Sequence, residues 1–271
     1  MEHPERLTIG IVGCGSIGRA IVKAADEGRL HARVGGVTTR TPERAEAFLS
    51  TMRNAPSLVE LDDLIRACDL IVEAAGGHVV DSLARRTFAA GRSLVVISVG
   101  ALLDHPDLFD LAREKACDLV VPSGAIAGLD GVKAACEGLV DFVRLTSRKP
   151  PRALEGAPFL LEHGISLQGL TEPRLLFKGP AREAVRGFPD NLNVSAALSL
   201  AGIGPDLTEV AISADPAVER NCHDIEVKGE FGVLNVHIEN IPGENPKTGR
   251  LTALSIVRTI NDYADRVRIG T

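Results

Sequence analysis

The sequence predicts an α/β fold in which a doubly wound parallel sheet is joined to a second domain of α+β character. Up to residue 122, short aliphatic runs alternate with amphipathic stretches at helical spacing, which is the pattern of parallel strands connected by helices. Beyond residue 123, longer strand-like segments follow one another and fewer helices separate them. Aromatic residues are scarce, with eight Phe, one Tyr and no Trp, so the core must be aliphatic, as is usual for buried parallel strands.

The elements of the first region can be placed from their hydrophobic periodicity. The expected strands are Leu7–Val12, Ala32–Thr38, Leu70–Ala74, Leu94–Val99 and Leu119–Val121, with a weaker one near Ser57–Val59. The expected helices are Ser16–Glu27, Pro42–Leu49, Leu61–Cys68, Val79–Ala90 and Pro106–Cys117. The second of these helices has the clearest start signal, because Thr41 can cap it and a proline occupies its first position.

The second region combines strands with two shorter helices. The expected strands are Leu139–Thr146, Arg174–Phe177, Leu207–Ser213, Cys222–Lys228 and Val233–Glu239, and the expected helices are Ala181–Arg186 and Asn193–Leu200. Gly229–Gly232 is typical of a four-residue hairpin loop between the last two strands. The tail Gly249–Asp265 has apolar residues at helical spacing, and we expect that helix to pack back on the first domain. We therefore predict one domain from residues 1–123 plus 246–271 and another from residues 124–245.

Charge and composition argue against several classes of protein. The 271 residues carry a net charge of −6 without a basic stripe, so nucleic acid is not an expected partner. No apolar stretch approaches the roughly 20 residues of a transmembrane helix, and residues 1–6 lack the basic flank of a signal peptide. The five cysteines are odd in number and none fits a CxxC spacing, which disfavours a disulfide framework or a zinc site. We expect a cytoplasmic protein with reduced thiols, no metal and no membrane partner.

The hexapeptide GCGSIG lies between a predicted strand and a predicted helix and matches the pattern G-x-G-x-x-G. The pattern alone is weak, since the chain has 27 glycines, but a Rossmann-type dinucleotide site requires this setting. Gly13 permits the tight turn, Gly15 lets the backbone approach the pyrophosphate, and Gly18 allows the helix to pack closely on the strand. Ser16 and Ile17 open the helix, whose amides and positive dipole attract phosphate. A glycine-rich turn without a ligand is the alternative.

The end of the second predicted strand indicates which dinucleotide binds. Enzymes that select NAD usually carry Asp or Glu there, about 20 residues after the glycines, to bind the ribose 2′-hydroxyl. This chain has Thr38, Thr39 and Arg40 instead. The threonines can hydrogen-bond a hydroxyl and Arg40 can pair with a 2′-phosphate, so we expect NADP to be accepted beside NAD. A solvated loop charge at Arg40 is the alternative.

Small residues follow other strands as well. The segment AAGG begins at Ala74 and the segment SVGA begins at Ser98. Ligands of open α/β sheets lie outside the carboxyl ends of the strands, so we expect Ala74 to let a flat ring approach the backbone. A third small segment, Ser123–Asp130, lies at the predicted domain junction, which is a preferred place for a binding site. Tight helix packing would explain each glycine equally well.

Two features of the second domain indicate catalysis on an anionic substrate. Arg148 and Lys149 form a local cationic cluster that suits a dicarboxylate, because Arg offers a planar fork and Lys a point charge. His223 shares a strand face with Ile225 and Val227, since the period of a strand is two, so it points to the interior or to a cleft. An imidazole there can carry protons near neutral pH. The respective alternatives are a solvated basic loop and a hydrogen-bonded core histidine.

Six segments together resemble the L-aspartate dehydrogenase family. They follow the family's order over nearly the whole chain and are Gly13–Gly18, Pro122–Asp130, Thr146–Pro150, Asn191–Leu200, Asn221–Asp224 and Asn245–Ser255. The glycine loop is generic, and the other five segments are far more specific. The resemblance implies a Rossmann-type domain, an α+β substrate domain and a homodimer. It also implies that the family's catalytic histidine maps to His223 and that its cofactor contacts map to Ala127 and Asn193.

The resemblance further implies the reaction. L-Aspartate would be oxidised with NAD or NADP to iminoaspartate, which hydrolyses to oxaloacetate and ammonia, and the family is associated with supplying iminoaspartate to NAD biosynthesis. From local charge, and not from the resemblance, we expect Arg148 and Lys149 to hold one carboxylate, while His223 would activate water or accept a proton from the amine. One alternative is another two-domain reductase, dihydrodipicolinate-reductase-like or homoserine-dehydrogenase-like. Another is a dinucleotide-sensing regulator without turnover.

Overall fold

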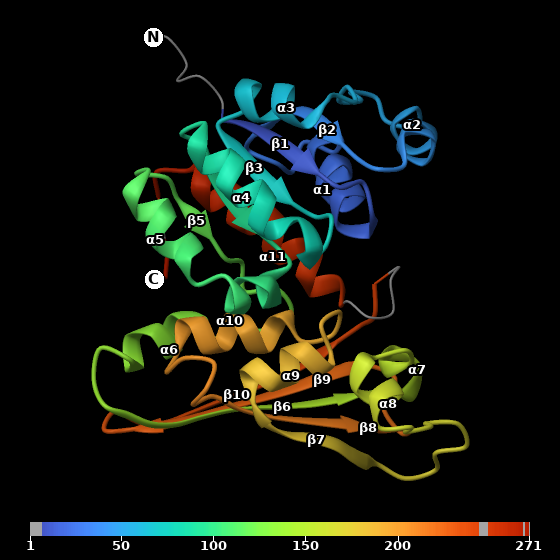
Figure 1. Ribbon diagram of the computed structural model, residues 1–271, viewed down its shortest axis with the longest axis vertical. Helices are drawn as coiled ribbons and strands as arrows, with labels where there is room; N and C mark the ends of the chain where they lie inside the picture. Colours follow the sequence, from blue (N-terminus) through green and yellow to red (C-terminus); the bar gives the residue numbers. More distant parts are fainter. Residues whose placement is uncertain (1–6, 244–248, 268, 271) are drawn as a thin grey trace. The chain divides into compact units, whose positions relative to one another are not determined.

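The computed structural model describes residues 7–243, 249–267 and 269–270 (Figure 1). Residues 1–6, for which we expected no signal peptide, therefore lie outside the described residues. The same is true of the first four residues of the segment Asn245–Ser255. The chain divides into two compact units, Met1–Pro122 with Ala253–Arg268 and Ser123–Thr252 with Ile269–Thr271.

The first unit contains a five-stranded parallel sheet in the order β2-β1-β3-β4-β5. Its strands are β1 (Thr8–Val12), β2 (Arg33–Thr38), β3 (Leu70–Glu73), β4 (Ser93–Val96) and β5 (Leu119–Val120). The chain leaves β1 toward β2 on one side and returns as β3 on the other, so the strand order reverses between β1 and β3. The weak strand expected near Ser57–Val59 is reduced to an isolated bridge between Leu58 and Val37.

Helices cover both faces of this sheet (Figure 1). They are α1 (Ser16–Asp26), α2 (Pro42–Leu49), α3 (Leu61–Ala67), α4 (Val80–Ala89), α5 (Asp107–Glu114) and α11 (Arg250–Ala264), with the 3₁₀ turns η1 (Gly77–Val79) and η2 (Val99–Asp104). On one face, α1 and α2 pack on the aliphatic strands together with Ile256, Val257 and Ile260 of α11. The tail helix therefore completes the core of the first unit.

The second unit contains a mixed sheet in the order β10-β9-β6-β8-β7, in which only β6 and β8 run parallel among the described strands. Its strands are β6 (Val140–Lys149), β7 (Arg174–Pro180), β8 (Glu209–Ala214), β9 (Asn221–Gly229) and β10 (Gly232–Asn240). Its helices are α6 (Leu129–Ala135), α7 (Pro151–Leu154), α8 (Pro158–Glu162), α9 (Ala181–Gly187) and α10 (Asn193–Ala201). Figure 1 shows α6, α9 and α10 on one face of this sheet.

One local expectation for the second unit needs correction, and two short helices had not been predicted. The hairpin loop has two residues rather than four, because Gly229 and Gly232 still pair across β9 and β10. The sequence did not reveal α7 and α8, since four or five residues are too few to show a helical period. Each of these short helices has a proline at its start, which is the one local signal they carry.

Candidate active site

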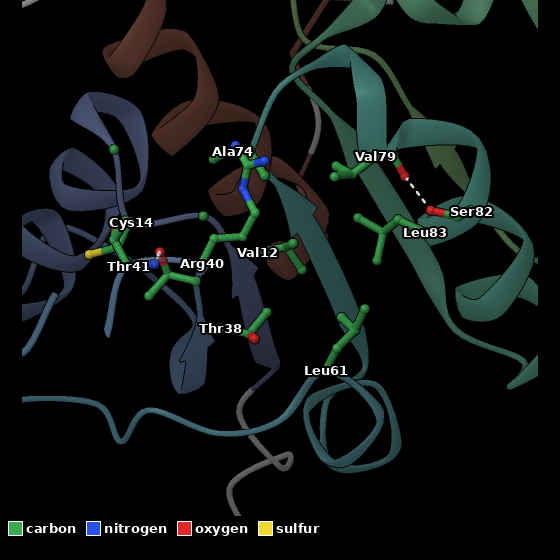
Figure 2. Close-up of a pocket in the computed structure, with 14 residues that line it drawn as sticks. Val12, Cys14, Thr38, Arg40, Thr41, Leu61, Ala74, Val79, Ser82 and Leu83 are labelled. Carbon is green, nitrogen blue, oxygen red and sulfur yellow. Dashed lines mark hydrogen bonds between the residues drawn. The ribbon is translucent and has the colours of Figure 1, made fainter. Parts of the chain in front are cut away.

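A pocket of about 380 Å³ lies at the carboxyl ends of β1, β2 and β3 (Figure 2). Its walls are the glycine loop after β1, residues 38–41 after β2, Ala74 and Ala75 after β3, and the first turn of α4. This is the place where the strand order reverses. Doubly wound sheets bind dinucleotides at such a point.

The three glycines of the loop meet different surroundings. Gly13 has φ +105°, and a Cβ atom there would lie 2.4 Å from the carbonyl oxygen of Ala74. A Cβ on Gly18 would lie 2.0 Å from the carbonyl oxygen of Gly13. Gly15 also lines the pocket, but its Cβ would have no atom within 4 Å. The fold thus requires Gly13 and Gly18, whereas the space beside Gly15 is left for a ligand that approaches the backbone.

The start of α1 faces this space. Gly15 precedes the helix, and Ser16, Ile17 and Gly18 form its first turn. The amides of a first turn have no partners within the helix, and together with the helix dipole they bind phosphate. The loop therefore fits the pyrophosphate of a dinucleotide.

Thr38, Thr39 and Arg40 line the pocket after β2, and Figure 2 shows the extended side chain of Arg40 among the lining residues. None of the described residues that line the pocket is Asp or Glu. The carboxylate that usually binds a ribose 2′-hydroxyl is therefore not part of this lining.

Glu73, the last residue of β3, is a site residue that the sequence analysis missed. Its side chain is fully buried. Oε1 accepts hydrogen bonds from the amides of Ala75 and Gly76, each at 2.8 Å, and from Ser98 Oγ at 3.1 Å. Oε2 accepts from the amides of Ile97 at 3.2 Å and Ser98 at 2.8 Å. One carboxylate thus anchors the loops after both β3 and β4.

The sequence predicted that this strand ends at Val99, but β4 ends at Val96. The same hydrogen bonds explain the difference. The amides of Ile97 and Ser98 turn to Glu73 instead of continuing the ladder. The one signal in the sequence was a charged residue at the end of the aliphatic run LIVE.

We expect Glu73→Gln to lower the free energy of unfolding by about 2–3 kcal/mol, because its amide group would face donors that now bind a carboxylate oxygen. The dissociation constant for NADH should also rise, since the displaced loop carries Ala74 and Ala75. Urea unfolding followed by circular dichroism and NADH fluorescence titration measure the two effects. Glu60→Gln, the same change at an exposed residue, is the control. Equal stability and affinity in both variants would contradict the anchoring role.

In the second unit, His223 of β9 is 1% exposed and lies on the helix-covered face with Ile225 and Val227. Its Nδ1 atom is 2.9 Å from Ser147 Oγ on β6, and the two residues are partners in the register of β6 and β9. Burial, and secondly the charge of Lys149, lower the pKa of His223 to about 3. The imidazole is therefore neutral near pH 7, with its ring oriented by the Ser147 hydroxyl.

The structure separates the two cations that the sequence grouped together. Lys149 is 2% exposed, and its Nζ atom donates to the backbone oxygen of Asn191 at 3.2 Å. Burial lowers the pKa of Lys149 to about 8. Arg148 points to the opposite face, because neighbours on a strand alternate, and lies 3.8 Å from Asp215. Only Lys149 shares the face of His223.

The segment before α6 lies beside the start of α10. A Cβ on Gly124 would be 4.0 Å from Val194, and Asn240 of β10 donates to the carbonyl oxygen of Ala125 at 2.7 Å. Ala127 is exposed on this segment, and Asn193 is the first residue of α10. These two predicted cofactor contacts therefore belong to the same part of the second unit.

No three His, Cys, Asp or Glu side chains among the residues that the structure describes are placed to hold a metal ion. No helix in the described ranges has the length and apolar character to cross a membrane.

The doubly wound sheet and the glycine-lined pocket define an oxidoreductase that uses a nicotinamide dinucleotide. Residues 13–122 match the NAD-binding domain of homoserine dehydrogenase, and residues 130–263 match the C-terminal domain of aspartate dehydrogenase. Over its full length, the chain belongs to the L-aspartate dehydrogenase family.

Individual relatives agree with this assignment. The chain is 44% identical to L-aspartate dehydrogenase 3 of Bordetella bronchiseptica, with 100% of both chains covered. It is also 44% identical to L-aspartate dehydrogenase of Methanosarcina acetivorans, with 98% of this chain and 100% of that one covered. The crystal structure of aspartate dehydrogenase from Thermotoga maritima has the same fold, with a TM-score of 0.76, 24% identity and coverage of 97% and 99%. The predicted fold class and family are confirmed.

Proposed function

We propose that this protein oxidises L-aspartate to iminoaspartate, with NAD or NADP as the hydride acceptor, and that iminoaspartate then hydrolyses to oxaloacetate and ammonia. The observation that carries the proposal is the buried face around His223, in a chain that is 44% identical to named L-aspartate dehydrogenases and has a dinucleotide pocket. A neutral, oriented imidazole suits proton transfer at a substrate.

The dinucleotide, when bound, accepts a hydride from the substrate. We assign its contacts in the first unit to residues that line the pocket or open α1, namely Gly13, Gly15, Ser16, Ile17, Gly18, Thr38, Arg40 and Ala74. We keep Ala127 and Asn193 as cofactor contacts because the resemblance to the family implies them.

We assign catalysis to His223. Its neutral imidazole would accept the proton of a water molecule that attacks the imine, while Ser147 holds the ring in place. Of the two cations expected at the substrate, we retain Lys149 because it lies on this face, and we withdraw Arg148 because it points away from it.

The decisive experiment measures NADH and NADPH formation at alkaline pH with L-aspartate and with each of the other common amino acids. We expect turnover with L-aspartate alone. If the protein binds dinucleotide but oxidises no aspartate, the proposal fails, and another two-domain reductase or a regulator without turnover takes its place.

The NADP part of the proposal rests on Arg40 and can be tested separately. We expect Arg40→Ala to raise KM for NADP at least about tenfold, as loss of one charge-assisted contact to a 2′-phosphate predicts. KM for NAD should stay within about twofold. Arg44→Ala, at an exposed position of α2 outside the pocket, is the matched control. An equal effect on both dinucleotides would remove Arg40 from the 2′-phosphate site.

We further propose a cytoplasmic homodimer that binds neither nucleic acid nor membrane and supplies iminoaspartate to NAD biosynthesis. The acidic net charge and the five free cysteines support the location, and the family resemblance supports the dimer and the pathway. Light scattering should give twice the chain mass of 28.7 kDa. A monomer would contradict the dimer without affecting the proposed reaction.

A further inference from the structure

A patch of four buried polar side chains lies at one end of the helix-covered face of the second sheet. It consists of Ser147 and Lys149 on β6 and Asn221 and His223 on β9. Farther along the same face, the strand residues are buried and aliphatic, namely Val143, Leu145, Ile225 and Val227. Polar groups are costly to bury, so their concentration at one end of the face points to a site for a polar ligand.

The sheet register brings the four side chains together in two pairs. Ser147 and His223 form the first pair, since they are partners in the register of β6 and β9. The register runs on to Arg148 opposite Cys222. Continued by one more residue, it places Lys149 opposite Asn221, which is the second pair. Side chains that face each other across antiparallel strands have Cβ atoms about 5 Å apart. Lys149 and Asn221 can therefore contact one small ligand.

Lys149 is buried without a compensating carboxylate among the described residues. Its hydrogen bond to Asn191 uses one of three N–H donors. The titratable and charged groups on the surrounding elements are His223 on β9, Asp215 after β8, Arg152 on α7 and Asp190 before α10. Of these, Asp215 is turned to Arg148 on the other face, and Arg152 and Asp190 are exposed. No described group therefore holds Lys149 in its charged form.

Asn221 supplies the second, independent observation. The residue is 2% exposed, and no described residue donates a hydrogen bond to its buried Oδ1 atom. Such an acceptor costs about 1–3 kcal/mol unless a donor binds to it. The α-amino group of an amino acid is a donor of the right kind.

We propose that Lys149 is the base that takes the proton from the α-ammonium group of the substrate, and that Asn221 Oδ1 holds this amine beside it. The inference rests on the proposed function, because it needs an amino acid as substrate. It gives Lys149 a role in proton transfer instead of the carboxylate binding that local charge indicated.

The chemistry requires such a base. An ammonium nitrogen has no lone pair, so it cannot form the C=N bond as hydride leaves Cα. When neutral Lys149 accepts the proton, one N–H bond of the substrate breaks, its electron pair stays on the amine, and an N–H bond forms on Nζ. The amine lone pair then forms the C=N bond, Cα is oxidised by loss of hydride, and the nicotinamide is reduced.

Burial supports this assignment. It lowers the pKa of Lys149 to about 8, so the neutral base is populated in mildly alkaline solution, unlike an ordinary lysine. Burial, and secondly the charge of protonated Lys149, keep the pKa of His223 low, which leaves that imidazole neutral for the later attack of water. Lys149 thus takes the proton of the amine, and His223 takes the proton of the attacking water.

The test is the pH profile of kcat/KM for L-aspartate in the wild type and in Lys149→Met. The wild-type value should rise through pH 8. Lys149→Met should lose at least about 100-fold, as loss of a general base predicts, and its profile should no longer rise near pH 8. Lys178→Met, the same substitution at an exposed position of β7, is the control and should match the wild type.

Asn221 has its own readout. Asn221→Ala should raise KM for aspartate at least about tenfold, while the rise through pH 8 remains. Asn235→Ala, on the exposed face of β10, is the control. Both test variants should keep the wild-type circular dichroism spectrum and affinity for NADH. The shape of a pH profile belongs to the folded fraction, so partial unfolding would not conceal it.

A raised KM with an unchanged pH profile in Lys149→Met would overturn the proposal and make Lys149 a carboxylate anchor. A wild-type KM in Asn221→Ala would remove Asn221 from the amine site. A wild type that oxidises no aspartate would instead overturn the proposed function, and that result appears before any variant is made.

Discussion

His223→Ala should lose at least about 100-fold in kcat with L-aspartate, since proton transfer by one positioned side chain contributes about 10²–10⁴-fold. The affinity for NADH should stay close to the wild-type value, because His223 is not among the residues assigned to the dinucleotide in either unit. His237→Ala is the matched control, as this second histidine of the same hairpin is exposed on β10. Equal losses in both variants, or none in His223→Ala, would contradict a catalytic role for His223.

Ser147→Ala separates orientation from chemistry. Ser147 contacts the imidazole, and the variant keeps the imidazole but removes the hydrogen bond at Nδ1 that orients it. We expect a smaller loss in kcat, about tenfold, as one hydrogen bond of about 1–1.5 kcal/mol predicts. A Ser147→Ala loss as large as that of His223→Ala would mean that the serine itself contacts the substrate.

The low pKa of His223 also has a consequence for stability in acid. The folded-state pKa is about 3, below the ordinary value of 6.5, so the unfolded chain binds the proton first as the pH falls. The contribution of this group to stability is fully present above pH 6.5 and is lost between pH 6.5 and pH 3. His223→Ala should therefore lose less stability than the wild type on acidification over this range, as measured by urea unfolding at each pH.

Gly15→Ala should raise the dissociation constant for NAD at least about tenfold and leave the free energy of unfolding within about 0.5 kcal/mol of wild type. The reason is that an added Cβ meets no protein atom and instead enters the space assigned to the pyrophosphate. In Gly18→Ala, the Cβ would lie 2.0 Å from the carbonyl oxygen of Gly13, so this variant should lose stability as well as affinity.

The two glycine variants form a matched pair because each adds one methyl group to the same loop. Isothermal titration with NAD and thermal unfolding followed by circular dichroism measure the two quantities. If Gly15→Ala bound NAD as tightly as the wild type, the pyrophosphate would not lie at this loop. If Gly18→Ala were as stable as the wild type, the close packing of α1 on the loop would not be required.

The sequence predicted the elements of the fold well where their signals are local. The aliphatic runs of β1 and β3 and the proline at the start of α2 needed no knowledge of distant residues. The error in the end of β4 arose because a distant partner decides it. Glu73 shortens β4 from a different strand, and no local pattern reveals a carboxylate that binds the amides of two loops.

In the candidate site, too, the residues with a local signal were predicted and those that depend on distant groups were not. The period of two placed His223 on the face of Ile225, and the structure buries both. The same rule separates Arg148 from Lys149, but the argument from local charge treated these neighbours as one cluster. Asn221 could not be found from the sequence, because an acceptor without a donor is recognisable only when all surrounding groups are known.

The contribution of α11 to the core of the first unit affects the order in which the protein can fold during synthesis. Ile256, Val257 and Ile260 are synthesised only after the whole segment 123–252 has been made. At about 5–20 residues per second, these 130 residues take roughly 6–26 s. Nearly all of the second unit is therefore made before the first unit can be completed, although the first begins earlier. Throughout this interval, the part of the aliphatic core that α11 covers stays exposed on the nascent first unit, where a chaperone that binds apolar surface can reach it.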